Sequence, residues 1–169
     1  SLFFCFYAQY TNEDKYYQVA EKYFDESIAL INNVSNYKII YKTDSIDCHF
    51  SNVGRFLEFA KKNDFLDMDT NVYLNDVDDI MYELMKKKIQ KGDMDLSSGA
   101  MTAGHYFLSR LRSNPELVAP LKELVLGLEK TVHKDRDGDH YWTAPILDNN
   151  VYFGISHGSA MMLSFLASM

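Results

Sequence analysis

The chain has 169 residues and a formal net charge of −7, with 17 Lys and Arg against 24 Asp and Glu. Its scattered lysines argue against nucleic acid or anionic lipid as a partner, because binding phosphate requires a concentrated basic surface. The 47% hydrophobic content is typical of a globular protein. The length predicts a single domain over residues 1–169.

The two cysteines, Cys5 and Cys48, are too few for a disulfide framework and lack the spacing of a zinc ribbon. We therefore expect a reducing, cytoplasmic setting. No apolar run approaches the roughly 20 residues that span a bilayer. The opening "SLFFCFYAQY" has no start Met and no basic region, so it is not a signal peptide, and it reads as a helix cut partway.

Hydrophobic periodicity predicts helices along almost the whole chain. The first is apolar nearly all round, which predicts a buried helix. "YKIIYK" at 37–42 is the only segment expected to form a strand, and 133–152 is expected to be a polar loop. Gly92 is a candidate helix C-cap, and Asn114 a candidate N-cap. The expected helices cover residues 1–10, 13–34, 50–62, 71–90, 99–112 and 117–132, with a last one from near Ser156.

Compact apolar helices alternate with longer amphipathic ones. The apolar helices begin near residues 1, 50, 99 and 157, a spacing of roughly 50 to 60 residues. This order predicts an all-α fold of helical hairpin repeats, with the apolar helices inside and the amphipathic helices covering them. Such hairpins stack into a solenoid or close into an α/α toroid.

Two apolar helices begin with pairs of small residues. "LSSGAMTAGHYFL" contains Gly99 and Gly104, and "FGISHGSAMML" contains Gly154 and Gly158. Small residues let inner helices approach closely at one end. They also leave the N–H groups of the first turn pointing towards the centre, where polar ligands bind.

The tetrad "SHGS" and the segment "DMDLSSGAMTAGHYFL", placed at this repeat spacing, resemble the lanthionine synthetase C-like family, the lantibiotic cyclases. The resemblance extends over the whole chain, as about the first half of a family member. It implies an α/α toroid that is incomplete, with about half of the toroid present. A half toroid exposes the apolar flanks of its terminal hairpins, so we expect the fragment to self-associate.

By this resemblance the parent is an enzyme that adds cysteine thiols of a precursor peptide to dehydroalanine or dehydrobutyrine, closing thioether rings. The implied partners are a precursor peptide with dehydrated Ser or Thr and, as a second candidate, a lantibiotic dehydratase. Zinc, held by two cysteines and a histidine, is expected in a full-length member. Cys5 and Cys48 do not match those ligand motifs. We therefore expect no metal and no other cofactor in this fragment, and no activity from it alone.

Two candidate catalytic residues follow from the resemblance. His157 matches the histidine that serves as acid or base, and Asp95 matches the acidic residue of the preceding repeat. An imidazole is a suitable proton donor to the carbon that becomes an enolate during the addition. Each residue also has a simpler interpretation. His157 could be a helix-start residue bonded to backbone, and Asp95 could be a helix N-cap or a turn residue.

Other functions stay open at this stage. The chain could be a helical module that binds peptide without chemistry, or part of a carbohydrate-active α/α toroid with paired carboxylates. "KDRDGDHYW" at 134–142 fails the spacing of a calcium loop and predicts a solvated acidic turn. Trp142 is expected to pack that turn against the helices.

Overall fold

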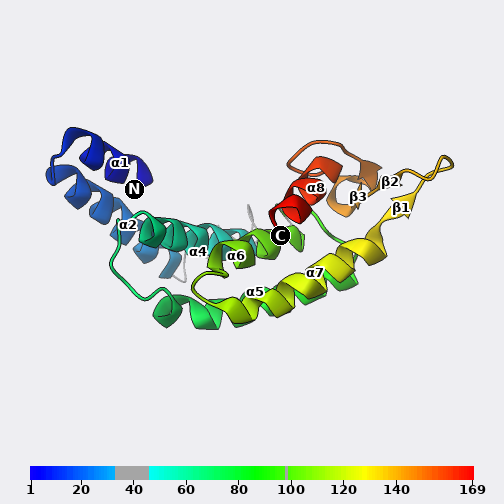
Figure 1. Ribbon diagram of the computed structural model, residues 1–169, viewed down its shortest axis with the longest axis horizontal. Coiled ribbons are helices and arrows are strands. Elements are labelled where there is room, and N and C mark those ends of the chain that lie inside the picture. The colour runs from blue at the N-terminus through cyan, green and yellow to red at the C-terminus, as the bar shows by residue number, and fades with distance from the viewer. Residues whose placement is uncertain (33–45, 98) are drawn as a thin grey trace.

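The computed structural model describes residues 1–32, 46–97 and 99–169 (Figure 1). In these ranges the chain is mostly helical, and the all-α prediction is confirmed. Two turns of 3₁₀-helix lie at Pro115–Leu117 and Pro145–Leu147. The helices are α1 Leu2–Thr11, α2 Lys15–Asn32, α4 Ile46–Lys62, α5 Asn71–Gln90, α6 Met101–Arg110, α7 Val118–Thr131 and α8 Ser159–Ser168.

Most helix ends lie close to the predicted ones. Gly92 follows α5 with φ +70, as a C-cap glycine should. The side chain of Asn114 accepts a hydrogen bond from the N–H of Glu116, which confirms it as an N-cap. The last helix begins at Ser159 and not near Ser156, because Gly158 is extended (φ −131, ψ −175) and the chain before it forms a turn. The predicted strand at 37–42 lies outside the described residues.

The polar loop after α7 contains two short antiparallel hairpins that sequence reasoning did not predict. β1 (His133–Lys134) pairs with β2 (His140–Tyr141), and β3 (Thr143–Ala144) pairs with β4 (Asn150–Val151). Trp142 lies between the hairpins and is 9% exposed. Its indole N–H donates to the carbonyl oxygen of Leu128 over 3.0 Å, which fastens the loop to α7 as expected.

Helices α4 and α6 pack side by side and run parallel (Figure 1). Contacts along the pair keep a nearly constant offset in sequence. Ser51 donates to the carbonyl oxygen of Thr102, 51 residues later, and Arg110 contacts Glu58, 52 residues earlier. Between them Gly54 leaves room for the ring of Tyr106, which a Cβ atom would overlap. The two helices therefore meet in a fixed register.

The long helices α5 and α7 contact each other and cover α6, and α5 also contacts α4. The core lies between these layers, and α8 completes it from the other side through Met161, Met162 and Phe165. At Gly104 a Cβ atom would lie 2.5 Å from Leu124 and 3.0 Å from Phe165, so this glycine lets α6 approach both neighbours. Other core side chains are Met81, Met85, Met94, Met101, Phe107, Leu121 and Leu128.

The prediction of a buried first helix is wrong for most of its side chains. Only Cys5 and Ala8 are buried in α1, whereas Phe3 is 67% and Tyr10 87% exposed. The main neighbour of α1 is α2. One neighbouring helix can cover one face only, so an apolar sequence all round leaves the remaining faces exposed.

Candidate functional site

The structure brings together the two residues that the sequence singled out. Nδ1 of His157 lies 2.5 Å from Oδ2 of Asp95, although 62 residues separate them in the chain. The carboxylate of Asp95 is fully buried, and the imidazole of His157 is 35% exposed. The pair therefore has a buried acidic side and an accessible imidazole side.

Asp95 is held by the loop that precedes α6. Its Oδ1 accepts a hydrogen bond from the N–H of Ser97 over 2.6 Å, and its carbonyl oxygen accepts one from the N–H of Gly99 over 3.0 Å. Asp93 supports the same loop, because its side chain accepts from the N–H of Asp95 and its carbonyl oxygen from that of Ala100. Asp95 is therefore a turn residue. The cap position of α6 is Ala100, so the N-cap interpretation does not hold.

Gly99 makes this tight loop possible. A Cβ atom at Gly99 would collide with the backbone nitrogen of Asp95 and would lie 2.5 Å from the carboxylate of Asp93. Any larger residue would push the loop apart where it bends back on itself. The glycine that marks the helix start in the sequence thus acts by letting the loop close.

His157 is held by a second closed turn, which precedes α8. The N–H of Gly158 donates to the carbonyl oxygen of Gly154, and that of Ser159 donates to Tyr152, both over 3.0 Å. A Cβ atom at Gly158 would collide with the backbone of Tyr152. The ring contact of His157 is with the carboxylate of Asp95, and not with the backbone as the simpler interpretation proposed.

This geometry suits proton transfer. A carboxylate facing Nδ1 favours the tautomer with the proton on Nδ1, because a carboxylate only accepts hydrogen bonds. Nε2 is then the nitrogen that exchanges a proton with another molecule. An imidazole oriented by a buried carboxylate is a common acid or base in enzymes.

The cysteines do not form a metal site. The thiol of Cys48 donates to the carbonyl oxygen of Ser97 over 2.8 Å, which ties α4 to the Asp95 loop. Burial raises the pKa of the Cys5 thiol, which opposes the thiolate form that zinc requires. Within residues 1–32, 46–97 and 99–169 no three His, Cys, Asp or Glu side chains are grouped closely enough to hold a metal ion. The described residues therefore do not fit the zinc centre that the resemblance implies for a full-length member.

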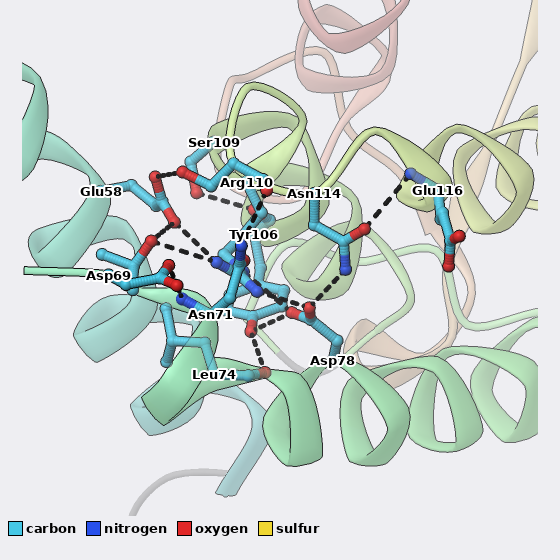
Figure 2. A network of polar contacts seen from close by, with 12 residues as sticks. Glu58, Asp69, Asn71, Leu74, Asp78, Tyr106, Ser109, Arg110, Asn114 and Glu116 are labelled. Atoms are coloured by element: carbon cyan, nitrogen blue, oxygen red, sulfur yellow. Dashed lines mark hydrogen bonds and ion pairs between the residues drawn. The ribbon is translucent and has the colours of Figure 1, made fainter.

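A second polar cluster, missed by sequence reasoning, lies inside the helical layers (Figure 2). Arg110 at the end of α6 has no exposed surface. Its Nη1 lies 2.7 Å from Oε1 of Glu58 in α4. Its Nε and Nη2 donate to the two oxygens of Asp78 in α5, over 3.0 and 2.6 Å. One guanidinium thus joins three helices.

Hydroxyl and amide groups fill the remaining positions around both carboxylates. The hydroxyl of Tyr106 donates to Asp78 over 2.5 Å, and the side chain of Asn114 donates to its other oxygen. Thr70 and Ser113 each donate to Glu58 over 2.7 Å. Neither carboxylate therefore has an oxygen free of a donor.

The electrostatics keep the guanidinium of Arg110 charged. Burial alone would lower the pKa of Arg110, but its hydrogen bonds to Asp78 and Glu58 outweigh burial and raise it. Burial and the bond to Asp78 raise the pKa of Tyr106, so the phenol stays a donor. A sequence signal for the cluster does exist, since Asp78 occupies the same face of α5 as the buried Leu74, Met81 and Met85. A charged residue at a core position indicates a buried partner.

The chain is thus all-α in its described ranges and brings an aspartate and a histidine together between two helix starts marked by glycines. Comparison with protein families gives a match to lanthionine synthetase C-like proteins over residues 1–169, the whole chain. The chain belongs to the lanthionine synthetase C-like family. Comparison with curated proteins and with solved structures gave no match. No helix in the described ranges is long and apolar enough to cross a membrane.

Proposed function

We propose that this chain provides the proton-transfer part of a lanthionine cyclase-like site, with His157 as the acid or base and Asp95 as its orienting partner. The observation that supports the proposal is the 2.5 Å contact between Nδ1 of His157 and Oδ2 of Asp95. Membership in the family supports the reaction class. The parallel packing of α4 and α6 is compatible with an α/α toroid, of which the chain would form a part.

The proposed reaction is the addition of a peptide thiol across the double bond of dehydroalanine or dehydrobutyrine. The sulfur forms a bond to the β-carbon, and the π electrons move to the α-carbon to give an enolate. The α-carbon then takes a proton from Nε2 of the His157 imidazolium. The proton that the thiol loses restores the ring. Asp95 holds the ring in place throughout, with Nδ1 facing its carboxylate.

In this reaction the metal would act on the attacking thiol and not on the proton transfer. When bound, zinc would supply the thiolate, since it lowers the pKa of a coordinated thiol. Because the described residues do not fit a zinc centre, we propose that the ligands come from other residues of the protein. The chain alone would then deliver protons without generating thiolate, and would close rings poorly.

The proposed partner is a precursor peptide with dehydrated Ser or Thr. Its dehydroamino acids would be formed by a dehydratase, because dehydration of Ser or Thr is the reaction that produces them. A reducing, cytoplasmic setting would keep the peptide thiols free to react.

The proposal can be tested without metal. A peptide with one dehydroalanine and one cysteine is incubated with the 169-residue chain near pH 7.5, where about a tenth of a free thiol is ionised and about a tenth of a free imidazole is protonated, because their ordinary pKa values are about 8.5 and 6.5. The configuration of the new α-carbon is then measured by chiral chromatography of the hydrolysed product. Because His157 would deliver the proton from one side, we expect the ratio of the two configurations to differ from that of the protein-free reaction.

His157→Asn should return the ratio to that of the protein-free reaction, and Asp95→Asn should return it part of the way. His140→Asn, at an exposed histidine of β2, is the matched control and should leave the ratio of the wild-type chain unchanged. Equal ratios with and without the wild-type chain would contradict the proposal. A ratio that His157→Asn leaves unchanged would remove His157 as the donor.

No observation favours the carbohydrate-active alternative. Its paired carboxylates would need a free oxygen for acid or base work. In the buried cluster, Glu58 and Asp78 already receive hydrogen bonds at all of their carboxylate oxygens.

A further inference from the structure

A cleft of about 1030 Å³ lies where the C-terminal parts of α4 and α6 approach the start of α1. The apolar part of its lining includes Leu2, Phe56, Phe59 and Leu108. The Asp95 loop lies at the other end of the α4–α6 pair. Since α6 has ten residues, a helix length of about 15 Å separates the two places. The cleft is therefore not part of the aspartate–histidine site.

Positive charge is concentrated in this cleft. Arg55, Lys61 and Lys62 reach it from α4, and Arg112 reaches it from the turn after α6. No ion pair engages these four side chains in the described part of the chain. The lysines lie in the last turn of α4, where they complement the helix dipole. That explanation does not extend to Arg55 in the middle of α4, or to Arg112 beyond α6.

The carboxylates of the cleft do not cancel this charge. Glu58 lines the wall, but it is bonded to Arg110, Thr70 and Ser113. Asp64 is the other carboxylate of the lining and lies exposed. Four cations thus face one uncompensated carboxylate in a chain whose net charge is −7. Lysines and arginines that look scattered in the sequence meet here in space, so a concentrated basic surface does exist.

We infer that this cleft binds an acidic peptide segment that has apolar side chains between its carboxylates. Guanidinium groups such as those of Arg55 and Arg112 form paired hydrogen bonds to carboxylates. Phe56 and Leu108 supply the apolar surface between the charges. The volume lies just above the usual range for small-molecule sites and suits several peptide residues. A long polyanion such as nucleic acid fits less well, because the rest of the acidic surface repels it.

This inference goes beyond the proposed reaction and does not depend on it. The test uses a fluorescein-labelled peptide in which Glu and Asp alternate with Phe and Leu, measured by fluorescence anisotropy at low salt with the 169-residue chain. We expect saturable binding that weakens as salt is added. The double variant Arg55→Glu with Arg112→Glu should weaken binding by about tenfold or more, since charge reversal replaces attraction with repulsion.

The matched control is Lys130→Glu with Lys134→Glu, which changes the net charge equally at exposed residues of α7 and β1 outside the cleft lining. It should change the affinity by about twofold or less. Circular dichroism checks the fold of each variant. If the reversals do not fold, Arg55→Gln with Arg112→Gln replaces them and should still weaken binding several-fold.

Three results would overturn the inference. A peptide with Gln and Asn in place of Glu and Asp could bind equally well, which would leave an apolar groove without charge selection. The control variant could weaken binding as much as the cleft variant, which would make net charge the cause. A single-stranded oligonucleotide or inorganic phosphate could compete as strongly as the acidic peptide, which would make the cleft a general anion site.

Discussion

Arg110 donates to both carboxylate oxygens of Asp78, from Nε over 3.0 Å and from Nη2 over 2.6 Å. Both side chains are buried, and Glu58 contacts the same guanidinium from another helix. A buried cation that satisfies two carboxylates is hard to replace, because its loss leaves both of them charged and without compensation.

Arg110→Met should therefore destabilise the chain strongly. We expect the free energy of unfolding to fall by about 3–5 kcal/mol, the usual cost of removing one partner of a buried ion pair. Urea denaturation followed by circular dichroism measures it. Arg112→Met, at an exposed arginine two residues later, is the control and should cost less than about 0.5 kcal/mol. If Arg110→Met lowered the free energy of unfolding as little as Arg112→Met does, the cluster would contribute little to stability.

Replacing the whole charged set should restore part of that stability. In Arg110→Met with Asp78→Asn and Glu58→Gln, no carboxylate stays buried without its counter-ion. We expect the triple variant to be more stable than Arg110→Met alone, because it leaves no uncompensated charge in the interior. Urea denaturation followed by circular dichroism compares the free energies of unfolding of the two variants. A triple variant that is less stable would indicate that the hydrogen bonds of the two acidic side chains matter more than their charge.

The half-buried His105 in α6 predicts a dependence of stability on pH. Burial, and then the charge of Arg55, lower its pKa below the ordinary 6.5 in the folded chain. The unfolded chain therefore binds more protons than the folded chain as pH falls below about 6.5, and stability falls with it. Above that pH His105 is neutral in both the folded and the unfolded chain, so it does not make the free energy of unfolding depend on pH.

Urea denaturation at pH 7.5 and at pH 5 tests this contribution. His105→Gln should reduce the loss of stability between the two values, because Gln does not titrate. His140→Gln, at an exposed position, should leave the loss as it is in the wild-type chain. An unchanged pH dependence in His105→Gln would assign the effect to other groups.

Gly99 is expected to be intolerant of substitution. In Gly99→Ala the new methyl group would overlap the backbone of the Asp95 loop, so the loop must shift. We expect a loss of about 1–3 kcal/mol, as in other overpacked positions. The matched control is Gly154→Ala, since nothing lies within 4 Å of a Cβ atom there. Thermal unfolding compares the two, and an equally mild effect at Gly99 would show that the loop can relax.

The contact between His157 and Asp95 should fix the tautomer of the imidazole. A carboxylate accepts only, so Nδ1 must carry the proton in the neutral ring, whereas the amide of Asp95→Asn can donate to Nδ1 instead. We expect the ¹⁵N shifts of His157 to show protonated Nδ1 in the wild-type chain and a shift towards protonated Nε2 in the variant. His140 in the same spectrum is the reference. A neutral ring in the wild-type chain with its proton on Nε2 and none on Nδ1 would contradict the geometry.

Much of the fold could be predicted from the sequence, because apolar periodicity marks helices directly. The helix expected over 71–90 is α5, and the glycines before α6 and α8 marked where Asp95 and His157 would lie. That these two residues touch could be expected only from the family resemblance. Spacing along one chain does not tell which loops meet.

What the sequence did not reveal depends on contacts between distant segments. The role of Arg110 requires Glu58 and Asp78 from two other helices. The position of Asp78 on the core face of α5 indicates a buried partner, but it does not tell which residue that partner is. The exposure of α1 was missed because apolar composition indicates how much a helix can bury, and not how many neighbours are present to cover it. The hairpins after α7 are only two residues per strand, too short for an alternating pattern.

The fixed register of α4 and α6 also has a consequence for inheritance. The positions of α4 that contact α6 have counterparts about fifty residues later, so a substitution at one of them changes the surroundings of its counterpart directly. Glu58 and Arg110 should therefore change together among descendants of this sequence, and an insertion within either helix should be rarer than one in the segments between them. Selection therefore acts on contacting positions of α4 and α6 together, as pairs, and not on each position alone.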